Sequence, residues 1–416
     1  MRPEGTPSRL IVYYPRFRRQ EDFGNHYHRA AWYLPKSEGV VDEVVLGVVE
    51  RMRQDQRPSY MASSRQPTDH IRQEEDPKCY REMVERADVV LVWSSKNELP
   101  LPEDEMVGKR VIYVDTQDPE LMEWGAYCGL HWWLMGPAAR REVLRRSQGT
   151  FRELMALPEI EGSDVSVVLG TGPSVERAFE FDFSRCISIV CNTAIKDPDL
   201  LAHVKPKFVT AGDAVSHFGV SLYAERFRED LATVLHEWDV YLFATAMYGN
   251  LFRLQFPELK ERILLCEQTR QEPVFDLATY WGIPKLDSTL NVHMLPLAAT
   301  FNDVVYLLGC DGRRPDGRGN EDFWGHSTRT QYHELVTTGH RAHPMFDVRR
   351  QRVTEAFFRE STTYTLALGE RRHNKTYRSL SRSFTPAIDR RAVFCDQFVS
   401  KQKNGLKLIE SRNSIK

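Results

Sequence analysis

The 416-residue sequence lacks any apolar run that approaches the roughly 20 residues of a membrane-spanning helix. Its first residues, MRPEGTP, also lack the apolar stretch of a signal peptide. The sequence has seven cysteines, and no two of them have the CxxC spacing of a zinc or redox site. We therefore expect a cytoplasmic protein with reduced thiols and without a disulfide framework.

The sequence has little net charge, but its charge is unevenly distributed. The formal net charge is −2, whereas residues 341–416 hold 17 Lys and Arg against 7 Asp and Glu, a local charge of +10 that leaves −12 on the rest of the chain. A basic segment of this kind suits an anionic partner such as a membrane face, a lipid-linked acceptor or nucleic acid, and a solvated helical face explains it equally well. Among the anionic partners we favour peripheral contact with the inner face of the cytoplasmic membrane, and we expect no nucleic acid partner.

Short apolar runs that alternate with helix-compatible polar stretches indicate an α/β fold. The runs have the length of buried strands. Strands that alternate with helices form parallel sheets, so we expect two Rossmann-like domains with mainly parallel sheets. The expected strands are residues 10–14, 44–49, 89–93 and 111–114, followed by 165–169, 187–190, 208–211, 240–244, 263–266 and 304–308.

We expect three parts in the chain. Residues 1–150 form an N-terminal Rossmann-like domain of unknown role, in which the polar segment 52–76 is a loop. Residues 163–340 form the second domain, and a linker with a short helix over 151–157 precedes it. Residues 341–416 form a basic helical C-terminal segment.

The turn Gly170-Thr171-Gly172-Pro173-Ser174 directly follows the expected strand 165–169. Glycine lets backbone N–H groups approach a ligand closely, and Ser174 can cap the helix that follows. The turn lacks the Gly-Lys-Ser/Thr of a P-loop and the full dinucleotide fingerprint. On its own such a sequence is more often an ordinary strand–helix turn, so it predicts nucleotide contact only together with the other strand-end motifs.

Two further motifs stand where a nucleotide would contact the edge of a parallel sheet. Asn192 follows a predicted strand, and its amide can donate to and accept from a base or ribose, or satisfy its own backbone in a turn. Ser288 and Thr289 open a helix predicted over 288–301, with Pro296 as a possible kink. The N–H groups at that helix start, together with a hydroxyl, suit a phosphate.

Acidic and basic residues follow the last strand of the second domain. Asp311 lies at the strand end, and Arg313 lies just beyond it. Residues 313–320 have the composition of a flexible lid whose arginines clamp a leaving phosphate, or of a charged surface loop. Asp197-Pro198-Asp199 lacks the strand-end context of a metal-binding Asp-x-Asp motif, so we interpret it as a turn. We expect no metal and no cofactor.

His326 lies in the motif Trp324-Gly325-His326-Ser327, beyond the predicted lid. Histidine titrates near neutral pH and can accept a proton from a hydroxyl nucleophile. The chain has 13 histidines, so few of them can be catalytic. The position beside the lid makes His326 the best candidate for a general base, and His217, which follows Asp213 at another strand end, is the next candidate.

This series of motifs resembles the bacterial sialyltransferases of the metal-independent, GT-A-like family that uses CMP-activated sialic acid. Motility accessory factors and pterin pyrophosphokinase-like domains are its relatives. The family carries a Gly-Asn-Gly-Pro-Ser turn, a Cys-Asn strand end, a Thr-Ser-Gly helix start, a Gly-x-Asp-x-Tyr edge and a Gly-His-Ser element. The resemblance covers residues 163–385, and the spacing from Ser288-Thr289 to Asp311 matches the family pattern without a gap.

The resemblance implies roles for several residues. The family stabilises the departing CMP phosphate with tyrosine hydroxyls, where this chain has Arg313 and Phe323. Arginine can supply equivalent charge stabilisation, whereas phenylalanine cannot donate a hydrogen bond. By this resemblance Thr171 and Asn192 would contact the cytidine nucleotide. Thr289 would contact the donor, and His326 would act as the general base.

We therefore expect a glycosyltransferase that transfers a CMP-activated nonulosonic acid to a glycan or lipid-linked acceptor, with His326 as general base and Arg313 beside the departing CMP. One alternative is a pterin pyrophosphokinase-like enzyme, which predicts strict dependence on Mg²⁺ and ATP. Another is a non-catalytic sugar-nucleotide-binding subunit, which predicts binding without turnover. The expected nucleotide-binding residues are Gly170, Thr171, Gly172, Pro173, Ser174, Asn192, Ser288, Thr289 and Asp311.

Overall fold

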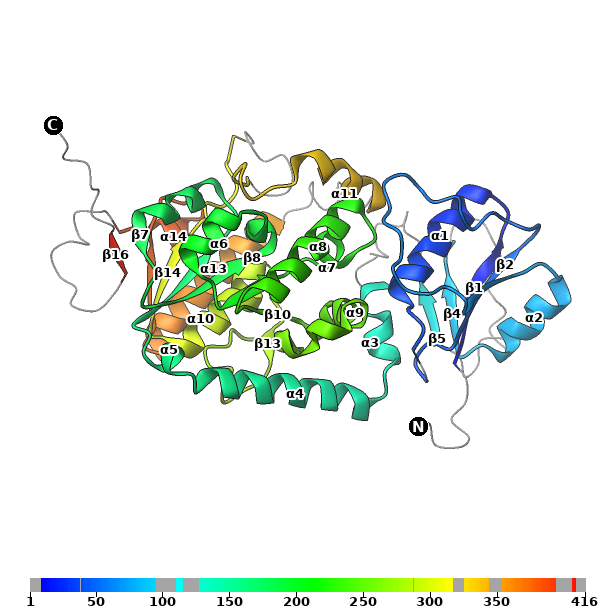
Figure 1. The fold of residues 1–416 in the computed structure, drawn as a ribbon, viewed down its shortest axis with the longest axis horizontal. Helices are drawn as coiled ribbons and strands as arrows, with labels where there is room; N and C mark the ends of the chain where they lie inside the picture. Colours follow the sequence, from blue (N-terminus) through cyan, green and yellow to red (C-terminus); the bar gives the residue numbers. More distant parts are fainter. Residues whose placement is uncertain are drawn as a thin grey trace.

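The structure, a computed structural model of the chain, describes residues 9–37, 39–94, 110–114, 127–286, 288–316, 325–343, 354–393 and 406–408. Figure 1 shows a smaller N-terminal part and a larger second part side by side. Residues 317–320 of the predicted lid fall outside these ranges, as do Phe323, Trp324 and much of the basic segment 341–416.

Five parallel strands form the N-terminal sheet, in the order β3-β2-β1-β4-β5. Successive residues of β1 face opposite sides of this sheet: the Tyr13 ring contacts His26 of α1, whereas Val12 packs with Tyr80 of α2. Helices therefore cover both faces, which explains why the central strands are almost wholly apolar. The elements are β1 (Leu10–Phe17), α1 (Gln20–Tyr33), β2 (Glu43–Val48), β3 (Ile71–Glu74), α2 (Pro77–Arg86), β4 (Val89–Val92) and β5 (Arg110–Tyr113).

Seven parallel strands form the second sheet, in the order β11-β10-β9-β8-β6-β14-β15. The prediction of two Rossmann-like α/β domains with parallel sheets is confirmed. The strands are β6 (Val165–Leu169), β8 (Cys186–Cys191), β9 (Phe208–Ala211), β10 (Tyr241–Thr245), β11 (Ile263–Cys266), β14 (Val304–Leu308) and β15 (Thr376–Ser379).

The order of the second sheet reverses between β6 and β14. From β6 the chain adds β8, β9, β10 and β11 on one side, and it then returns to place β14 on the other side of β6. In open parallel sheets, the crevice outside the carboxyl ends of two such strands is where ligands bind. The segments that follow β6 and β14 are therefore the place to look for a site.

Within the two main sheets, two strands lie where the sequence predicted none. β3 lies in the segment 52–76, which was expected to be a loop, and β15 lies in the segment 341–416, which was expected to be helical. Both are edge strands, and their sequences, Ile-Arg-Gln-Glu and Thr-Tyr-Arg-Ser, contain no apolar run. Because β15 pairs with β14, this part of the predicted C-terminal segment belongs to the second sheet.

A long helix, α4 (Pro137–Met155), replaces the short linker helix predicted over 151–157. It begins at a proline, whose fixed φ favours a first helical turn, and Figure 1 shows it running along the second part. Phe151 is fully buried, and the Ser147 hydroxyl accepts a hydrogen bond from the Leu265 N–H at 3.0 Å. Residues assigned by sequence to the end of the N-terminal domain therefore pack on β11.

The helix predicted over 288–301 begins with a wide π-helical turn, Leu290–Met294, and continues as α10 (Leu295–Phe301). The wide turn lies just before Pro296, which has no N–H to donate.

Two small sheets pair β12 (Gln268–Arg270) with β13 (Ile283–Pro284) and β7 (Phe181–Asp182) with β16 (Lys407–Leu408). The remaining helices are α3 (Leu130–Leu134), α5 (Pro158–Glu161), η3 (Pro173–Glu180), η4 (Asn192–Lys196), α6 (Pro198–Val204), α7 (Ala214–Phe218), α8 (Leu222–Glu237), α9 (Ala246–Gln255), η5 (Pro257–Arg262), η7 (His333–Leu335), α11 (Val336–Ala342), α13 (Thr354–Arg372) and α14 (Pro386–Asp389).

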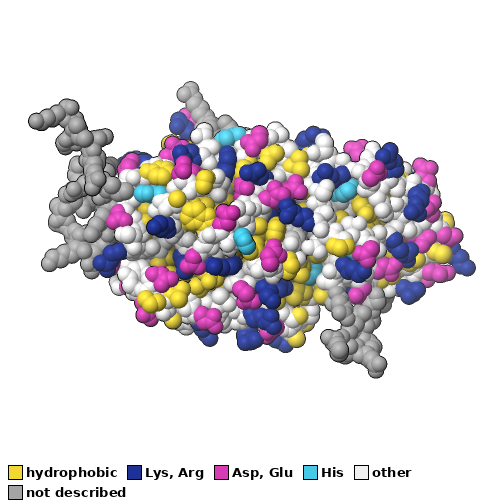
Figure 2. All heavy atoms as spheres, in the orientation of Figure 1, with side chains coloured by type: hydrophobic (Ala, Val, Ile, Leu, Met, Phe, Trp, Pro, Cys, Tyr) yellow, Lys and Arg dark blue, Asp and Glu magenta, His cyan; other side chains and the backbone are white. Residues whose placement is uncertain are grey.

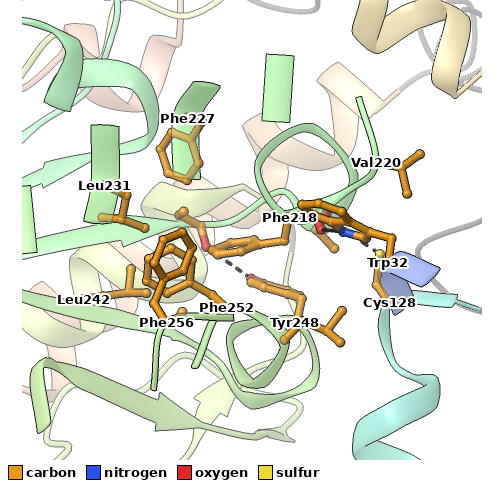
Figure 3. Close-up of a cluster of buried hydrophobic side chains, with 14 of the residues drawn as sticks. Trp32, Cys128, Phe218, Val220, Phe227, Leu231, Leu242, Tyr248, Phe252 and Phe256 are labelled. Carbon is orange, nitrogen blue, oxygen red and sulfur yellow. Dashed lines mark hydrogen bonds between the residues drawn. The ribbon is translucent and has the colours of Figure 1, made fainter. Parts of the chain in front are cut away.

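One hydrophobic core runs through both parts of the molecule. Figure 3 shows Trp32 of α1 and Cys128 beside Phe218 of α7. The Trp32 Nε1–H donates to the Phe218 carbonyl at 3.0 Å, and the guanidinium of Arg228 lies 3.8 Å from the centroid of the Trp32 ring. The N-terminal part thus packs directly on α7, a helix at the carboxyl end of β9.

The surface carries charge of both signs. Figure 2 shows Lys and Arg interspersed with Asp and Glu over the face in view, with small apolar patches between them. None of the helices in the described part of the chain combines the length and hydropathy that a membrane span requires.

Candidate functional site

The turns that follow β6 and β14 touch backbone to backbone. The Gly170 N–H donates to the Leu308 carbonyl at 2.8 Å, and the Gly172 N–H donates to the Gly309 carbonyl at 2.9 Å. A Cβ at Gly170 would lie 2.3 Å from the Gly309 oxygen, and Gly309 itself has a φ of +69°. Glycine at these positions is therefore required for close approach of the two turns.

Asp311 binds the β6 turn from the other side. Its carboxylate accepts hydrogen bonds from the Ser174 N–H at 3.2 Å and from the Ser174 hydroxyl at 2.8 Å. Burial raises the pKa of Asp311 above its ordinary value, although the bonds from Ser174 oppose that rise. The N–H groups of Gly170, Gly172 and Ser174 are thus engaged within the protein.

Asn192 and Thr289, which are far apart in the sequence, meet at the ends of β8 and β9. The Asn192 side-chain oxygen accepts from the Thr289 hydroxyl at 3.3 Å and from the Gly212 N–H at 3.4 Å. Asn192 has a φ of +49°, a conformation that asparagine tolerates better than most residues. The Ser288 hydroxyl accepts from the Asn291 N–H at 3.3 Å, whereas Thr289, which was also predicted to cap this helix, makes no side-chain cap bond.

His326 lies over the β6 turn. Its Nδ1 is 2.8 Å from the Thr171 hydroxyl oxygen. The segment that carries His326 is also held by the Thr171 carbonyl, which accepts from the Ser327 N–H at 2.8 Å and from the Thr330 hydroxyl at 3.0 Å. The structure therefore brings together Thr171 and His326, which the sequence had selected for separate roles.

An ion pair holds the same segment to the start of α6. Arg329 binds the Asp197 carboxylate through two nitrogens, with the Nη2–Oδ1 distance at 2.8 Å. Burial would raise the pKa of Asp197, but the bonds from Arg329 and the Leu200 N–H outweigh it, and the pKa is lowered. Asp197 also caps α6 through Leu200, in keeping with its interpretation as part of a turn. Sequence reasoning missed Arg329, because its partner lies far away in the chain.

His217 is a second histidine beside His326. It is buried on α7, and its Nδ1 lies 3.2 Å from the Asp213 carbonyl. Burial lowers the pKa of His217 to about 4, and the electrostatic influence of His326 acts in the same direction while Asp213 opposes it. His217 is therefore neutral at neutral pH.

A cavity of about 730 Å3 opens next to His326, over the ends of β6, β14 and β15. This volume is typical of small-molecule sites. Arg314, rather than the predicted Arg313, is among the described residues that line it. The others are Pro173, Asp311, Gly312, Gly325 and His326, with Arg382, Ser383, Phe384 and Asp389 from the segment after β15.

No protein-family model matches the chain, and no curated protein matches its sequence. Among solved structures, the sialyltransferase CstII from Campylobacter jejuni in complex with CMP-3FNeuAc is similar with a TM-score of 0.30 and 13% identity, over 52% of this chain and 81% of that chain. An alpha-2,3-sialyltransferase from Campylobacter jejuni in apo form gives 0.31 and 15%, over 61% and 87%. An NAD-dependent formate dehydrogenase from Staphylococcus aureus gives 0.17 and 8%, over 63% and 88%. Similarity of this size carries no argument about fold or activity.

Proposed function

We propose that this chain is a glycosyltransferase that transfers a CMP-activated nonulosonic acid, a sialic acid-like or related keto-sugar, to a hydroxyl of a glycan or lipid-linked acceptor. The observation that carries this proposal is the position of His326, held on Thr171 at the point where the strand order reverses and beside a ligand-sized cavity. A crevice at such a point is a nucleotide site in many parallel sheets. Histidine there is suited to accepting a hydroxyl proton.

The hydrogen bond to Thr171 is compatible with a general base in one tautomer of His326. When Nδ1 carries the proton and donates it to the Thr171 hydroxyl oxygen, Nε2 keeps a lone pair. In the proposed reaction the acceptor oxygen attacks the anomeric carbon and its proton passes to Nε2. The bond from the anomeric carbon to the phosphate oxygen breaks, and CMP leaves with that electron pair.

Charge on the departing CMP requires nearby donors. The sequence pointed to Arg313 and to the helix start at Thr289. Arg314 lines the cavity, so it is the better placed of the two neighbouring arginines. We propose that Arg314 offsets the negative charge on the departing CMP and that Arg313 makes a smaller contribution to the same effect.

A thermal-shift panel tests the nucleotide class, with CMP, CDP, UDP, GDP and ATP each measured with and without Mg²⁺. A ligand that binds only the native state raises the melting temperature, so CMP and CDP should do so without metal. Asn192→Gly should weaken that shift, because it removes the amide while glycine tolerates the positive φ. Asn374→Gly is the matched control, since Asn374 also has a positive φ and is exposed.

The same panel separates the alternatives. A shift that appears only with ATP and Mg²⁺ would favour a pterin pyrophosphokinase-like enzyme over the glycosyltransferase. A shift with CMP but no transfer to any acceptor would favour a non-catalytic sugar-nucleotide-binding subunit.

A further inference from the structure

The segment after β15, residues 380–389, is fixed against the β14 turn. The Ser383 hydroxyl donates to the Cys310 carbonyl at 2.8 Å, and the Phe384 N–H donates to the Asp311 carbonyl at 2.6 Å. Gly312 has a φ of +77°, and a Cβ there would lie 2.6 Å from the Thr385 hydroxyl oxygen. This side of the cavity is therefore a pre-formed wall.

An aromatic ring on this wall is left partly uncovered. Phe384 lines the cavity with 42% of its surface exposed, although burial of a phenylalanine side chain normally contributes about 1.5–3 kcal/mol. The Phe384 N–H is bound to the Asp311 carbonyl, which fixes the backbone at this position. The guanidinium carbon of Arg314 lies 5.4 Å from the ring centroid. A planar ligand that entered the cavity would meet an aromatic face and a guanidinium together.

Hydrogen-bonding groups of both kinds surround that ring. Asp389 accepts from the Ser383 N–H at 3.0 Å and pairs with Arg382 at 2.9 Å. Arg314 pairs with Asp316 at 2.9 Å. All of these except Asp316 line the cavity. A phosphate offers acceptors alone, whereas the edge of a nucleobase offers donors and acceptors, so the mixture fits a base better than a second phosphate.

We infer that this wall is the nucleobase subsite, in which the base of the donor nucleotide stacks on Phe384 and presents its edge to Asp389. Bases characteristically stack on aromatic rings and guanidinium planes. The wall faces the crevice between β6 and β14, where the strand order places a nucleotide. The inference rests on the proposed function, because it assumes that a nucleotide is the ligand.

The experiment measures the dissociation constants of CMP and of ribose 5-phosphate, which lacks a base, for the wild type and for Phe384→Ala. Stacking of one base contributes about 1–3 kcal/mol, so CMP should bind roughly 5- to 150-fold more weakly to the variant. Ribose 5-phosphate should bind as it does to the wild type. Phe357→Ala is the control, since Phe357 on α13 is 48% exposed and does not line the cavity.

A second variant tests the edge contact independently of stability. Asp389 can accept from the amino group of cytosine, whereas an asparagine there can also donate to the carbonyl of uracil. Asp389→Asn should therefore reduce the ratio of CMP to UMP affinity by about tenfold or more.

Three outcomes would overturn the assignment. If Phe384→Ala weakened the binding of CMP and of ribose 5-phosphate by the same factor, the ring would not contact the base. If Phe384→Ala bound CMP as the wild type does but had a raised KM for the acceptor, the wall would contact the acceptor instead of the base. A wild-type chain that binds none of the five nucleotides would overturn the proposed function and the subsite with it.

Discussion

A hydrogen bond joins His326 Nδ1 to the Thr171 hydroxyl, whose oxygen lies 2.8 Å away. It holds the imidazole over the β6 turn. The sequence identified both residues, but the family resemblance assigned Thr171 to the cytidine nucleotide. The contact between them could not be predicted, since it joins residues that are 155 positions apart.

Substitution of His326 by alanine should remove the proton acceptor and spare the nucleotide contacts. Loss of a general base costs about 10²–10⁴-fold in rate, so kcat should fall by that factor while the affinity for CMP stays within a few-fold. Initial-rate kinetics and calorimetry measure the two quantities. His333→Ala is the control, because His333 is exposed on η7. Full activity in His326→Ala would move the role of base to His217.

At the scale of elements, the segment from Gly325 to Tyr332 is a clamped loop rather than a loose one. The Arg329–Asp197 pair holds it to the start of α6, and the Tyr332 hydroxyl donates to Asp230 of α8 at 2.6 Å. Because the folded-state pKa of Asp197 is lowered, the stability that this pair contributes is fully present above the unfolded pKa of about 3.9 and is lost as the pH falls through the folded value.

Arg329→Gln should loosen the segment that carries His326. The Asp197 side chain is 5% exposed, and a buried acceptor that loses its partner costs about 1–3 kcal/mol of unfolding free energy. We expect a lower kcat, a KM for the donor within a few-fold of the wild type, and a lower melting temperature. Arg145→Gln, which breaks the exposed Arg145–Glu142 pair on α4, should change none of these. A fall in stability with no change in kcat would show that the clamp does not position His326.

The sequence predicted all the central strands of the two main sheets, which are buried on both faces. Residues 165–169 and 304–308 form apolar runs that only a central parallel strand needs, and they match β6 and β14. β3 reads Ile-Arg-Gln-Glu, with Ile71 as its one buried residue, so nothing in its composition distinguishes it from a loop. The strand ends that form the candidate site could be recognised in the sequence. The wall after β15 could not, because β15 has no apolar run that identifies it as a strand.

At the scale of the whole molecule, the N-terminal sheet is a support for the second one. Trp32 reaches the Phe218 carbonyl, and Arg228 of α8 is held between the Trp32 ring and the Gly219 carbonyl, to which it donates at 2.7 Å. Arg29 of α1 also donates to the Ala342 carbonyl at the end of α11. These contacts fall on α7, which carries His217, and on the helix that follows the His326 segment.

The shared core predicts that both parts unfold together. Differential scanning calorimetry of the wild type should show one transition, because neither sheet can lose its structure without exposing the core of the other. Trp32 is 4% exposed, and its replacement by alanine should cost about 3–5 kcal/mol and lower the melting temperature of the whole transition. Tyr113→Ala, at a residue that is 48% exposed, is the control. Two separate transitions in the wild type would contradict a shared core.

The pairing of β15 with β14 also sets the order in which the sheet can be completed on the ribosome. Val304 pairs with Thr376, 72 positions later, so at about 5–20 residues per second β15 is made roughly 4–14 seconds after β14. During that interval β14 offers an unpaired apolar edge, the kind of surface on which nascent chains associate. A chaperone that shields this edge, or a slow codon placed after residue 376 rather than before it, would change the yield of folded protein without altering one atom of the native state.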